Sequence, residues 1–241
     1  MPKYFVEPGA VRGEKAQLEG ETAHHLKRVL RIKAGESVIL CDGNGMDYNC
    51  VVESIEPLVL SVDSRRECKT ELPSRITLYQ AMLKSDKMEW IIQKSVEIGV
   101  YEIVPVYTEH SVIKPKNDKD NKTVRYQKIA ESAAGQSMRG IVPIVHKPME
   151  WKEALEHAAG RFMLAAHEKE YETKLQDFRA KLPELPEELG LWIGPEGGFS
   201  KKEVLEMEKA GFSPVSLGPR ILRAETAAIA ALSQIAGMLE I

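Results

Sequence analysis

The sequence is poor in cysteine and has no long apolar run. Its three cysteines, Cys41, Cys50 and Cys68, are odd in number and form no Cys-x-x-Cys pair. Neither a disulfide framework nor a zinc site is expected, and a reducing compartment is the natural environment. The start of the chain lacks the apolar core of a signal peptide, and no apolar run reaches membrane-spanning length. We expect a cytoplasmic protein without a bound metal.

Net positive charge is also missing. The 33 lysines and arginines are outnumbered by 36 aspartates and glutamates, which gives a formal net charge of -3. Such a chain has no global attraction for nucleic acid, so RNA binding would need local basic patches. A hydrophobic content of 43% and a charged content of 29% are typical of a globular protein. With 241 residues, the chain can form one large domain, or one small and one medium domain.

Both common nucleotide motifs are absent: there is no Gly-x-x-x-x-Gly-Lys-Ser/Thr loop and no Gly-x-Gly-x-x-Gly fingerprint. The chain has instead Gly-Pro-Glu-Gly-Gly at 194–198, after the apolar run 191–193, and a second loop after the run 215–217. Each run ends at a loop that leads into a helix, which is where α/β folds bind ligands. Ser200 and Glu203 predict a capping box for the helix after the first loop.

Glu196 lies within the glycine loop and narrows the choice of ligand. Its carboxylate would repel a phosphate bound by backbone amides, so a nucleotide polyphosphate is disfavoured. S-adenosylmethionine, a nucleoside cofactor with a sulfonium and an ammonium group, suits an acidic glycine loop better. The simpler alternative, that this pentapeptide is only a strand-to-helix turn, stays open at this point.

Residues 1 to about 70 predict a small β-rich domain. Short β-branched or aromatic runs between tight turns predict a barrel with strands at 4–6, 37–41, 48–55 and 58–62. Between the first two strands, residues 22–35 predict a basic helix and loop, with no acid between Glu21 and Glu36. This segment is either an amphipathic helix with Leu26, Val29 and Leu30 packed inward, or a contact for RNA phosphates.

After a polar connection at 67–74, predicted strands alternate with helices, which indicates a parallel α/β sheet. Ser85 is a candidate cap for a helix that Gly99 ends. The alanine-rich last helix favours tight core packing or, alternatively, a symmetric dimer. The lysine-rich residues 114–128 are either a solvated loop or an RNA contact. The predicted strands are 75–81, 101–106, 141–145 and 162–166, and the predicted helices are 86–98, 151–159 and 224–240.

Motifs over nearly the whole chain show a resemblance to a known family. Residues 194–199, Gly-Pro-Glu-Gly-Gly-Phe, and 217–227, Leu-Gly-Pro-Arg-Ile-Leu-Arg-Ala-Glu-Thr-Ala, resemble the paired cofactor motifs of SPOUT methyltransferases. Together with residues 25–31, 84–100 and 136–139, they more closely resemble the bacterial 16S rRNA (uracil-N3)-methyltransferase family, commonly called RsmE. That family uses S-adenosyl-L-methionine to methylate N3 of uridine 1498.

The resemblance implies a fold, partners and contacts. It implies a PUA-like β-barrel RNA-binding domain at 1–72 and a SPOUT α/β methyltransferase domain at 73–241 with a deep trefoil knot. Periodicity alone predicts a doubly wound fold without a knot. The resemblance also implies a homodimer that acts on 16S rRNA, either free or within the small ribosomal subunit. RNA contacts are expected at His25, Arg28, Arg31 and Lys84. Cofactor contacts are expected at Leu164, Glu168, Gly194, Pro195, Glu196, Gly198, Leu217, Gly218, Ile221, Leu222 and Thr226.

Methylation of a uracil N3 removes a proton from a weakly acidic imide, so the enzyme should stabilise negative charge on the uracil oxygens. Arginine does this without a shifted pKa. Arg223 is the first candidate, with Arg139 supplied across a dimer interface. Glu225 either accepts the proton or orients Arg223, and the alternatives are a helix N-terminal acid for Glu225 and a phosphate contact for Arg139.

Two other functions stay open at this stage. The first is a SPOUT methyltransferase with a different acceptor, such as a ribose 2′-hydroxyl. The second is a non-catalytic ribosome-assembly protein that binds RNA and retains the fold. The fit of residues 220–227 to the uracil-N3 family argues against the first, and the intact loops with Glu196, Arg223 and Glu225 argue against the second.

Overall fold

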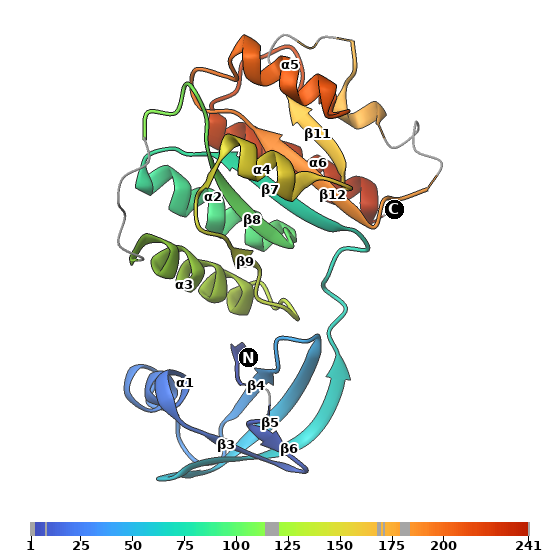
Figure 1. Cartoon of the computed structure of the whole chain (residues 1–241). Helices are drawn as coiled ribbons and strands as arrows, with labels where there is room; N and C mark the ends of the chain where they lie inside the picture. Colours follow the sequence, from blue (N-terminus) through green and yellow to red (C-terminus); the bar gives the residue numbers. More distant parts are fainter. Residues whose placement is uncertain are drawn as a thin grey trace. The chain divides into compact units, whose positions relative to one another are not determined.

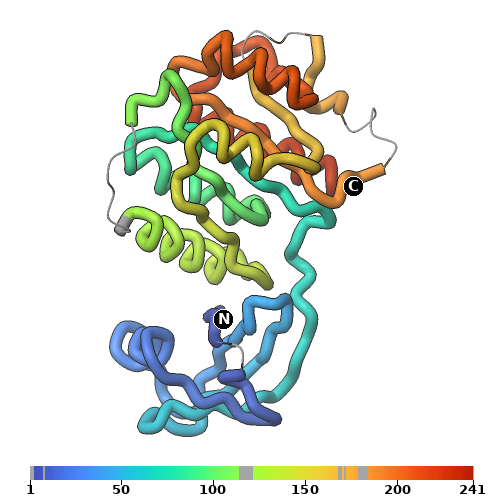
Figure 2. The backbone as a smooth tube through the Cα atoms, viewed as in Figure 1, coloured from blue at the N-terminus to red at the C-terminus, as the bar shows by residue number. Residues whose placement is uncertain are grey.

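The computed structural model describes residues 3–7, 9–113, 121–167, 170, 172–178 and 184–240. The chain, traced in Figure 2, forms two compact units. The first comprises Met1–Glu71 with Glu131–Val142, and the second comprises Leu72–Ala130 with Pro143–Ile241. Residues 131–142, which the sequence assigned to the second domain, thus group with the first unit. The functional division at 72/73 stays a prediction.

The first unit is built on a six-stranded sheet in the order β1-β4-β5-β6-β3-β2. Its pairings are antiparallel apart from the parallel pair β1 and β4. Alternate residues of β3, Ala16 and Leu18, are buried and join a core with Leu26, Leu40 and Leu60. The strands are β1 (Lys3–Phe5), β2 (Val11–Arg12), β3 (Lys15–Leu18), β4 (Ser37–Cys41), β5 (Met46–Ile55) and β6 (Leu58–Glu67).

The basic segment of this unit is a helix followed by a loop, as predicted, but part of the helix is wound differently. Helix α1 (Gly20–His24) continues into one π-helical turn, η1 (His25–Val29), and the loop follows it. Leu26 is fully buried, but Val29 and Leu30 are 63% and 45% exposed, so their predicted inward packing is wrong. The reason is the wide turn, closed by a hydrogen bond from Leu30 N to His25 O at 3.1 Å, which changes the residues that face the core.

The second unit has a seven-stranded sheet in the order β10-β8-β7-β12-β11-β13, with β9 paired to β8. Every pairing in this sheet is parallel. Strand β13 lies two residues earlier than predicted, because Ser216 leaves the pairing with β11 and forms an isolated parallel bridge with Lys174, in which it bonds Thr173 O and Leu175 N. The strands are β7 (Arg75–Ala81), β8 (Glu102–Tyr107), β9 (Ile144–Val145), β10 (Met149–Glu150), β11 (Phe162–Ala166), β12 (Glu188–Ile193) and β13 (Ser213–Val215).

Helices cover both faces of this sheet, with α4 in front and α6 behind in Figure 1. On one face, Trp192, Tyr79 and Met163 pack with residues of α4 and α5. On the other, α2 packs against α6. The helices are α2 (Ser85–Ile98), α3 (Asn121–Gln136), α4 (Trp151–Ala158), η2 (Leu175–Asp177, a 3-10 turn), α5 (Lys201–Lys209) and α6 (Ala224–Leu239). The predicted α/β architecture is confirmed, and the trefoil knot remains a prediction.

Helix ends test three sequence predictions. The capping box is confirmed: Glu203 N donates to Ser200 Oγ, and Ser200 N donates to Glu203 Oε2. The prediction that Ser85 caps α2 is wrong, because Ser85 is the first helical residue and the N-cap is Lys84. Gly99 ends α2 with a φ of +114°, as predicted.

Among the described residues, no helix combines the length and apolar composition needed to cross a membrane.

Candidate functional site

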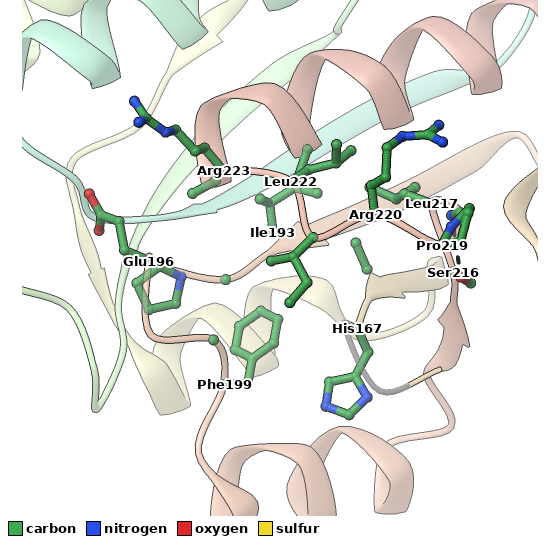
Figure 3. Close-up of a pocket in the computed structure, with 18 residues that line it drawn as sticks. His167, Ile193, Glu196, Phe199, Ser216, Leu217, Pro219, Arg220, Leu222 and Arg223 are labelled. Carbon is green, nitrogen blue, oxygen red and sulfur yellow. Dashed lines mark hydrogen bonds between the residues drawn. The ribbon is translucent and has the colours of Figure 1, made fainter. Parts of the chain in front are cut away.

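Two loops enclose a pocket at the carboxyl ends of β12 and β13 (Figure 3). The first loop, 194–200, leads from β12 to α5, and the second, 216–223, leads from β13 to α6. The pocket has a volume of about 430 Å³. Its lining residues are Ala166, His167, Ile193, Gly194, Pro195, Glu196, Gly198, Phe199, Ser216, Leu217, Gly218, Pro219, Arg220, Ile221, Leu222, Arg223, Ala224 and Ala227.

The glycine loop is held by its own turn and by the segment after β8. Gly198 has a φ of +67°, which favours glycine, and its N–H donates to Pro195 O at 3.0 Å. Buried Glu203 accepts from Ser200 N with one oxygen and from Glu109 N with the other, each at 2.8 Å. His110 Nδ1 lies 3.2 Å from Gly197 O and 3.1 Å from Gly198 O. Because both partners are carbonyls, His110 must carry a proton on Nδ1.

The second loop keeps its backbone close to the pocket. Gly218 has a φ of +110°, and a Cβ built there would meet nothing within 4 Å, so this side of the loop faces open space. Gly218 N donates to Ser216 Oγ at 3.3 Å, which holds the turn after β13. Arg220 and Arg223 extend in opposite directions from the loop, with Arg223 on the side of Glu196 (Figure 3).

Lys87 of α2 joins the two parts of the site electrostatically. Its Nζ lies 2.8 Å from Glu196 Oε1 and 3.3 Å from Glu225 Oε2. The hydrogen bond to Glu196 raises the pKa of Lys87. Burial raises the pKa of Glu196, but the hydrogen bond from Lys87, a backbone hydrogen bond and the charges of Lys87 and Lys84 together outweigh it, so the net pKa of Glu196 is lowered. Glu196 is therefore an ion-paired carboxylate, and Lys87 offsets part of the negative charge on which the sequence argument against a phosphate ligand rested.

Eight of the eleven predicted cofactor residues line the pocket: Gly194, Pro195, Glu196, Gly198, Leu217, Gly218, Ile221 and Leu222. Leu164 is buried inside β11 and Thr226 is exposed on α6, and neither is among the lining residues. Glu168 lies outside the described residues. Sequence reasoning missed Lys87 and several lining residues. His167 directly follows strand β11, so its position at a strand end could have indicated it.

The three predicted catalytic residues occupy different places. Arg223 lines the pocket, whereas the Glu225 carboxylate faces Lys87 and Glu225 is not among the lining residues. Arg139 belongs to the first unit, where it is only 2% exposed. Its guanidinium pairs with the Glu71 carboxylate, which also accepts from Gly140 N at 2.9 Å. Their catalytic roles stay predictions.

The predicted RNA contacts lie in both units. His25, Arg28 and Arg31 are exposed within one short segment of the first unit. Lys84 is exposed at the N-cap of α2 in the second unit. Of the lysine-rich residues 114–128, positions 114–120 lie outside the described residues.

Within the described residues, one cluster has the spacing of metal ligands: Glu102, His146 and His157, whose ligand atoms lie within 4.8 Å of one another. The Glu102 oxygens are already engaged, by Thr77 Oγ1 at 2.7 Å, Arg161 at 3.0 Å and His146 Nε2 at 2.7 Å. The positively charged guanidinium of Arg161, which contacts Glu102, would repel a metal ion bound in this cluster. Burial raises the pKa of Glu102, but the hydrogen bonds from His146 and Thr77 and the nearby charges lower it to about 2. The arrangement is that of an ion-pair network.

The sequence matches two families, one over the N-terminal part of the chain and one over the rest. Residues 70–236 match the family described as "RNA methyltransferase domain", and residues 18–61 match "RNA methyltransferase PUA domain". The fold and the pocket thus belong to an RNA methyltransferase, a class of enzyme.

Comparison with individual proteins narrows the family. The chain is 33% identical to ribosomal RNA small subunit methyltransferase E of Bacillus subtilis, over 100% of this chain and 98% of the relative. It is 34% identical to the protein of that name from Synechocystis, over 90% of this chain and 71% of the relative. The chain belongs to the ribosomal RNA small subunit methyltransferase E family, and the resemblance found in the sequence is confirmed.

Solved structures agree with this assignment. A ribosomal RNA small subunit methyltransferase E from Neisseria gonorrhoeae, bound to S-adenosyl methionine, superposes with a TM-score of 0.88 at 29% identity, covering 99% of this chain and 98% of the other. A putative methyltransferase from Legionella pneumophila, in complex with the same cofactor, gives 0.84 at 32% identity, covering 96% and 95%.

Proposed function

We propose that this protein transfers the methyl group of S-adenosyl-L-methionine to N3 of uridine 1498 in 16S rRNA. It acts in the cytoplasm as a homodimer, on rRNA within the small ribosomal subunit. The observation that carries the proposal is the two-loop pocket, which gathers eight of the predicted cofactor residues and Arg223 in a chain of this methyltransferase family.

The pocket residues fit the cofactor. The volume of about 430 Å³ lies within the range of small-molecule sites. Ile193, Phe199 and Leu222 provide apolar surface for a planar adenine, and the backbone at Gly218 leaves room for close approach. The cofactor residues that line the pocket would hold the nucleoside and the methionine parts. When bound, the cofactor supplies an electrophilic methyl carbon.

Arg223 stabilises the reacting uracil in this proposal. Loss of the N3 proton places negative charge on the uracil oxygens, and a guanidinium beside the pocket offsets that charge with hydrogen bonds of fixed geometry. Glu225 does not accept the proton in this proposal, because its carboxylate is ion-paired with Lys87. Its role is to orient Arg223. Arg139 is the weaker catalytic candidate, since its guanidinium is buried against Glu71 and would have to leave that pair.

Nucleoside mass spectrometry tests the proposal. Small subunits from cells that lack the modification are incubated with the protein and S-adenosyl-L-methionine, and the rRNA is then digested. We expect 3-methyluridine with the wild type and its loss with Arg223→Ala. Methyl groups on a ribose or on another base would contradict the N3 assignment. No transfer, together with no cofactor binding in calorimetry, would indicate a non-catalytic RNA-binding protein.

A further inference from the structure

Four consecutive residues of the first unit, Arg28-Val-Leu-Arg31, are all exposed at the end of the π-helical turn. Val29 and Leu30 are 63% and 45% exposed, although an amphipathic helix here would have buried them. Single exposed apolar residues are normal on a protein surface. Two adjacent ones between two arginines make a small apolar surface with a positive charge on each side.

This segment is anchored at both ends. Leu26 on one side is fully buried, and Ile32 on the other is 8% exposed, and both belong to the core of the first unit. Backbone bonds from Leu30 N to His25 O and from Ile32 N to Leu26 O, each at 3.1 Å, close the turn. Arg31 has a φ of +54°, which is uncommon for a residue other than glycine and is maintained by these surroundings. A turn held in this way presents Val29 and Leu30 in a defined arrangement.

The charge around the turn favours an anionic partner. No acid occurs in the sequence from 22 to 35, and Lys27, Arg28, Arg31 and Lys33 fall within that range. Lys27 is paired with Glu56 at 2.9 Å, whereas both arginines are exposed. A second copy of the chain fits less well, because a twofold contact through this surface would place arginines against the same arginines of the partner.

We propose that residues 28–31 form an RNA wedge, a name used here for this segment, in which Val29 and Leu30 pack against unpaired bases while Arg28 and Arg31 bind the flanking phosphates. The proposal rests on the proposed function, since it specifies how the rRNA is recognised. Exposed aliphatic side chains can insert between unstacked bases or cover them. Arginine adds to such contacts by binding the phosphates of the RNA backbone, which positions the protein on the RNA. Unpaired bases are also the part of RNA that proteins contact most readily, because the major groove of a paired RNA helix is too narrow for side chains. The wedge therefore selects looped over fully paired RNA.

Two double variants of the full-length protein separate the apolar contribution from the charged one. Val29→Ser with Leu30→Ser removes the apolar surface, and Arg28→Gln with Arg31→Gln removes the charges. Leu205→Ser on α5 is the control, because Leu205 is also an exposed aliphatic residue, at 55%, and lies in the second unit. The probes are an RNA hairpin with an open uridine-rich loop and a fully paired RNA duplex of the same length. Dissociation constants are measured over a range of salt concentrations.

We expect the apolar variant to bind the hairpin about tenfold more weakly, because the bases no longer cover aliphatic surface, with duplex binding and salt dependence unchanged. The arginine variant should weaken binding to both RNAs and lower the slope of log Kd against log salt concentration by about one to two. The control should match the wild type. Thermal melting of each variant checks that the changes leave the fold intact.

Hairpin binding by the apolar variant equal to that of the wild type would overturn the proposal. A change of oligomeric state in sedimentation, without a change in RNA affinity, would assign the surface to a second copy instead. Cofactor binding and methyl transfer by the wild type are measured in parallel. If the wild type transfers no methyl group, the proposed function fails; if it does and the wedge variants bind normally, only the wedge fails.

Discussion

Lys87 Nζ lies 2.8 Å from the carboxylate of Glu196, and this contact ties helix α2 to the glycine loop, 109 residues away in the sequence. The same ammonium is 3.3 Å from Glu225 in the first turn of α6. One lysine thus connects the first pocket loop with the helix that follows the second. Removing it would leave two neighbouring carboxylates without their shared counterion, at a place where the loops must keep their shape for a ligand.

Lys87→Met is expected to weaken S-adenosyl-L-methionine binding about fivefold, a modest loss because the pair is partly exposed to solvent. Isothermal titration calorimetry measures it. Lys87→Arg, which keeps the charge, should restore most of the affinity. Lys94→Met is the matched control, since Lys94 is on the same helix and pairs with Glu97. Unchanged cofactor affinity in Lys87→Met would show that the bridge does not shape the pocket.

Arg223→Ala is expected to lower kcat about 100-fold or more, with a much smaller change in KM for the cofactor, because its charge is needed only as the uracil oxygens become negative. Steady-state kinetics on small subunits measure both constants. Arg220→Ala, in the same loop, should have the smaller effect on kcat. An equal loss of kcat in both variants, or a loss confined to KM, would contradict the role given to Arg223.

The Glu102 network predicts an acid-sensitive fold. The pKa of Glu102 is about 2 in the folded protein, below the ordinary value of 4.5. The stabilisation is therefore complete above pH 4.5 and is lost as the pH falls towards 2. Its magnitude is on the order of 2 kcal/mol. Urea unfolding between those pH values should show a steeper loss of stability for the wild type than for Glu102→Gln. Glu208→Gln, an exposed carboxylate on α5, should behave like the wild type.

The capping box predicts a local stability effect at the site. Ser200→Ala removes the acceptor for Glu203 N and should lower the free energy of unfolding by about 1 kcal/mol. It should also weaken cofactor binding, since Glu203 holds both Ser200 and the segment after β8. Ser200→Thr retains the hydroxyl and serves as the control. Equal stability of the alanine and threonine variants in thermal unfolding would count against the cap.

Local patterns predicted the parts of the fold that depend on neighbouring residues. Strands β4, β7 and β11 have the predicted bounds because each is a buried apolar run between turn residues. The capping box follows from two residues three positions apart. Strands β2 and β3 were missed, since they are short and two residues of β3 are polar and exposed. The alternative in which Val29 and Leu30 pack inward is wrong, because hydrophobicity alone does not distinguish an α-helical from a π-helical turn.

In the candidate site, too, the features that are local in sequence could be predicted, and contacts between distant segments could not. The two loops and eight of their pocket-lining residues could be predicted, because glycine placement and the family motifs are local in sequence. The ion pairs Lys87–Glu196 and Arg139–Glu71 could not, since each joins residues from distant segments that only the folded chain brings together. The sequence argument therefore considered the charge of Glu196 without its lysine partner, and Arg139 as a catalytic or phosphate-binding group without its carboxylate partner.

Primer extension along 16S rRNA tests the central claim most directly, because a methyl group on uracil N3 blocks Watson–Crick pairing and stops reverse transcriptase. Unmodified small subunits are treated with S-adenosyl-L-methionine and either the wild type or Arg223→Ala. The account predicts a new stop at uridine 1498 with the wild type and a greatly reduced stop with the variant. A stop at another nucleotide, or transfer of radioactive methyl groups into the rRNA without any stop, would contradict it.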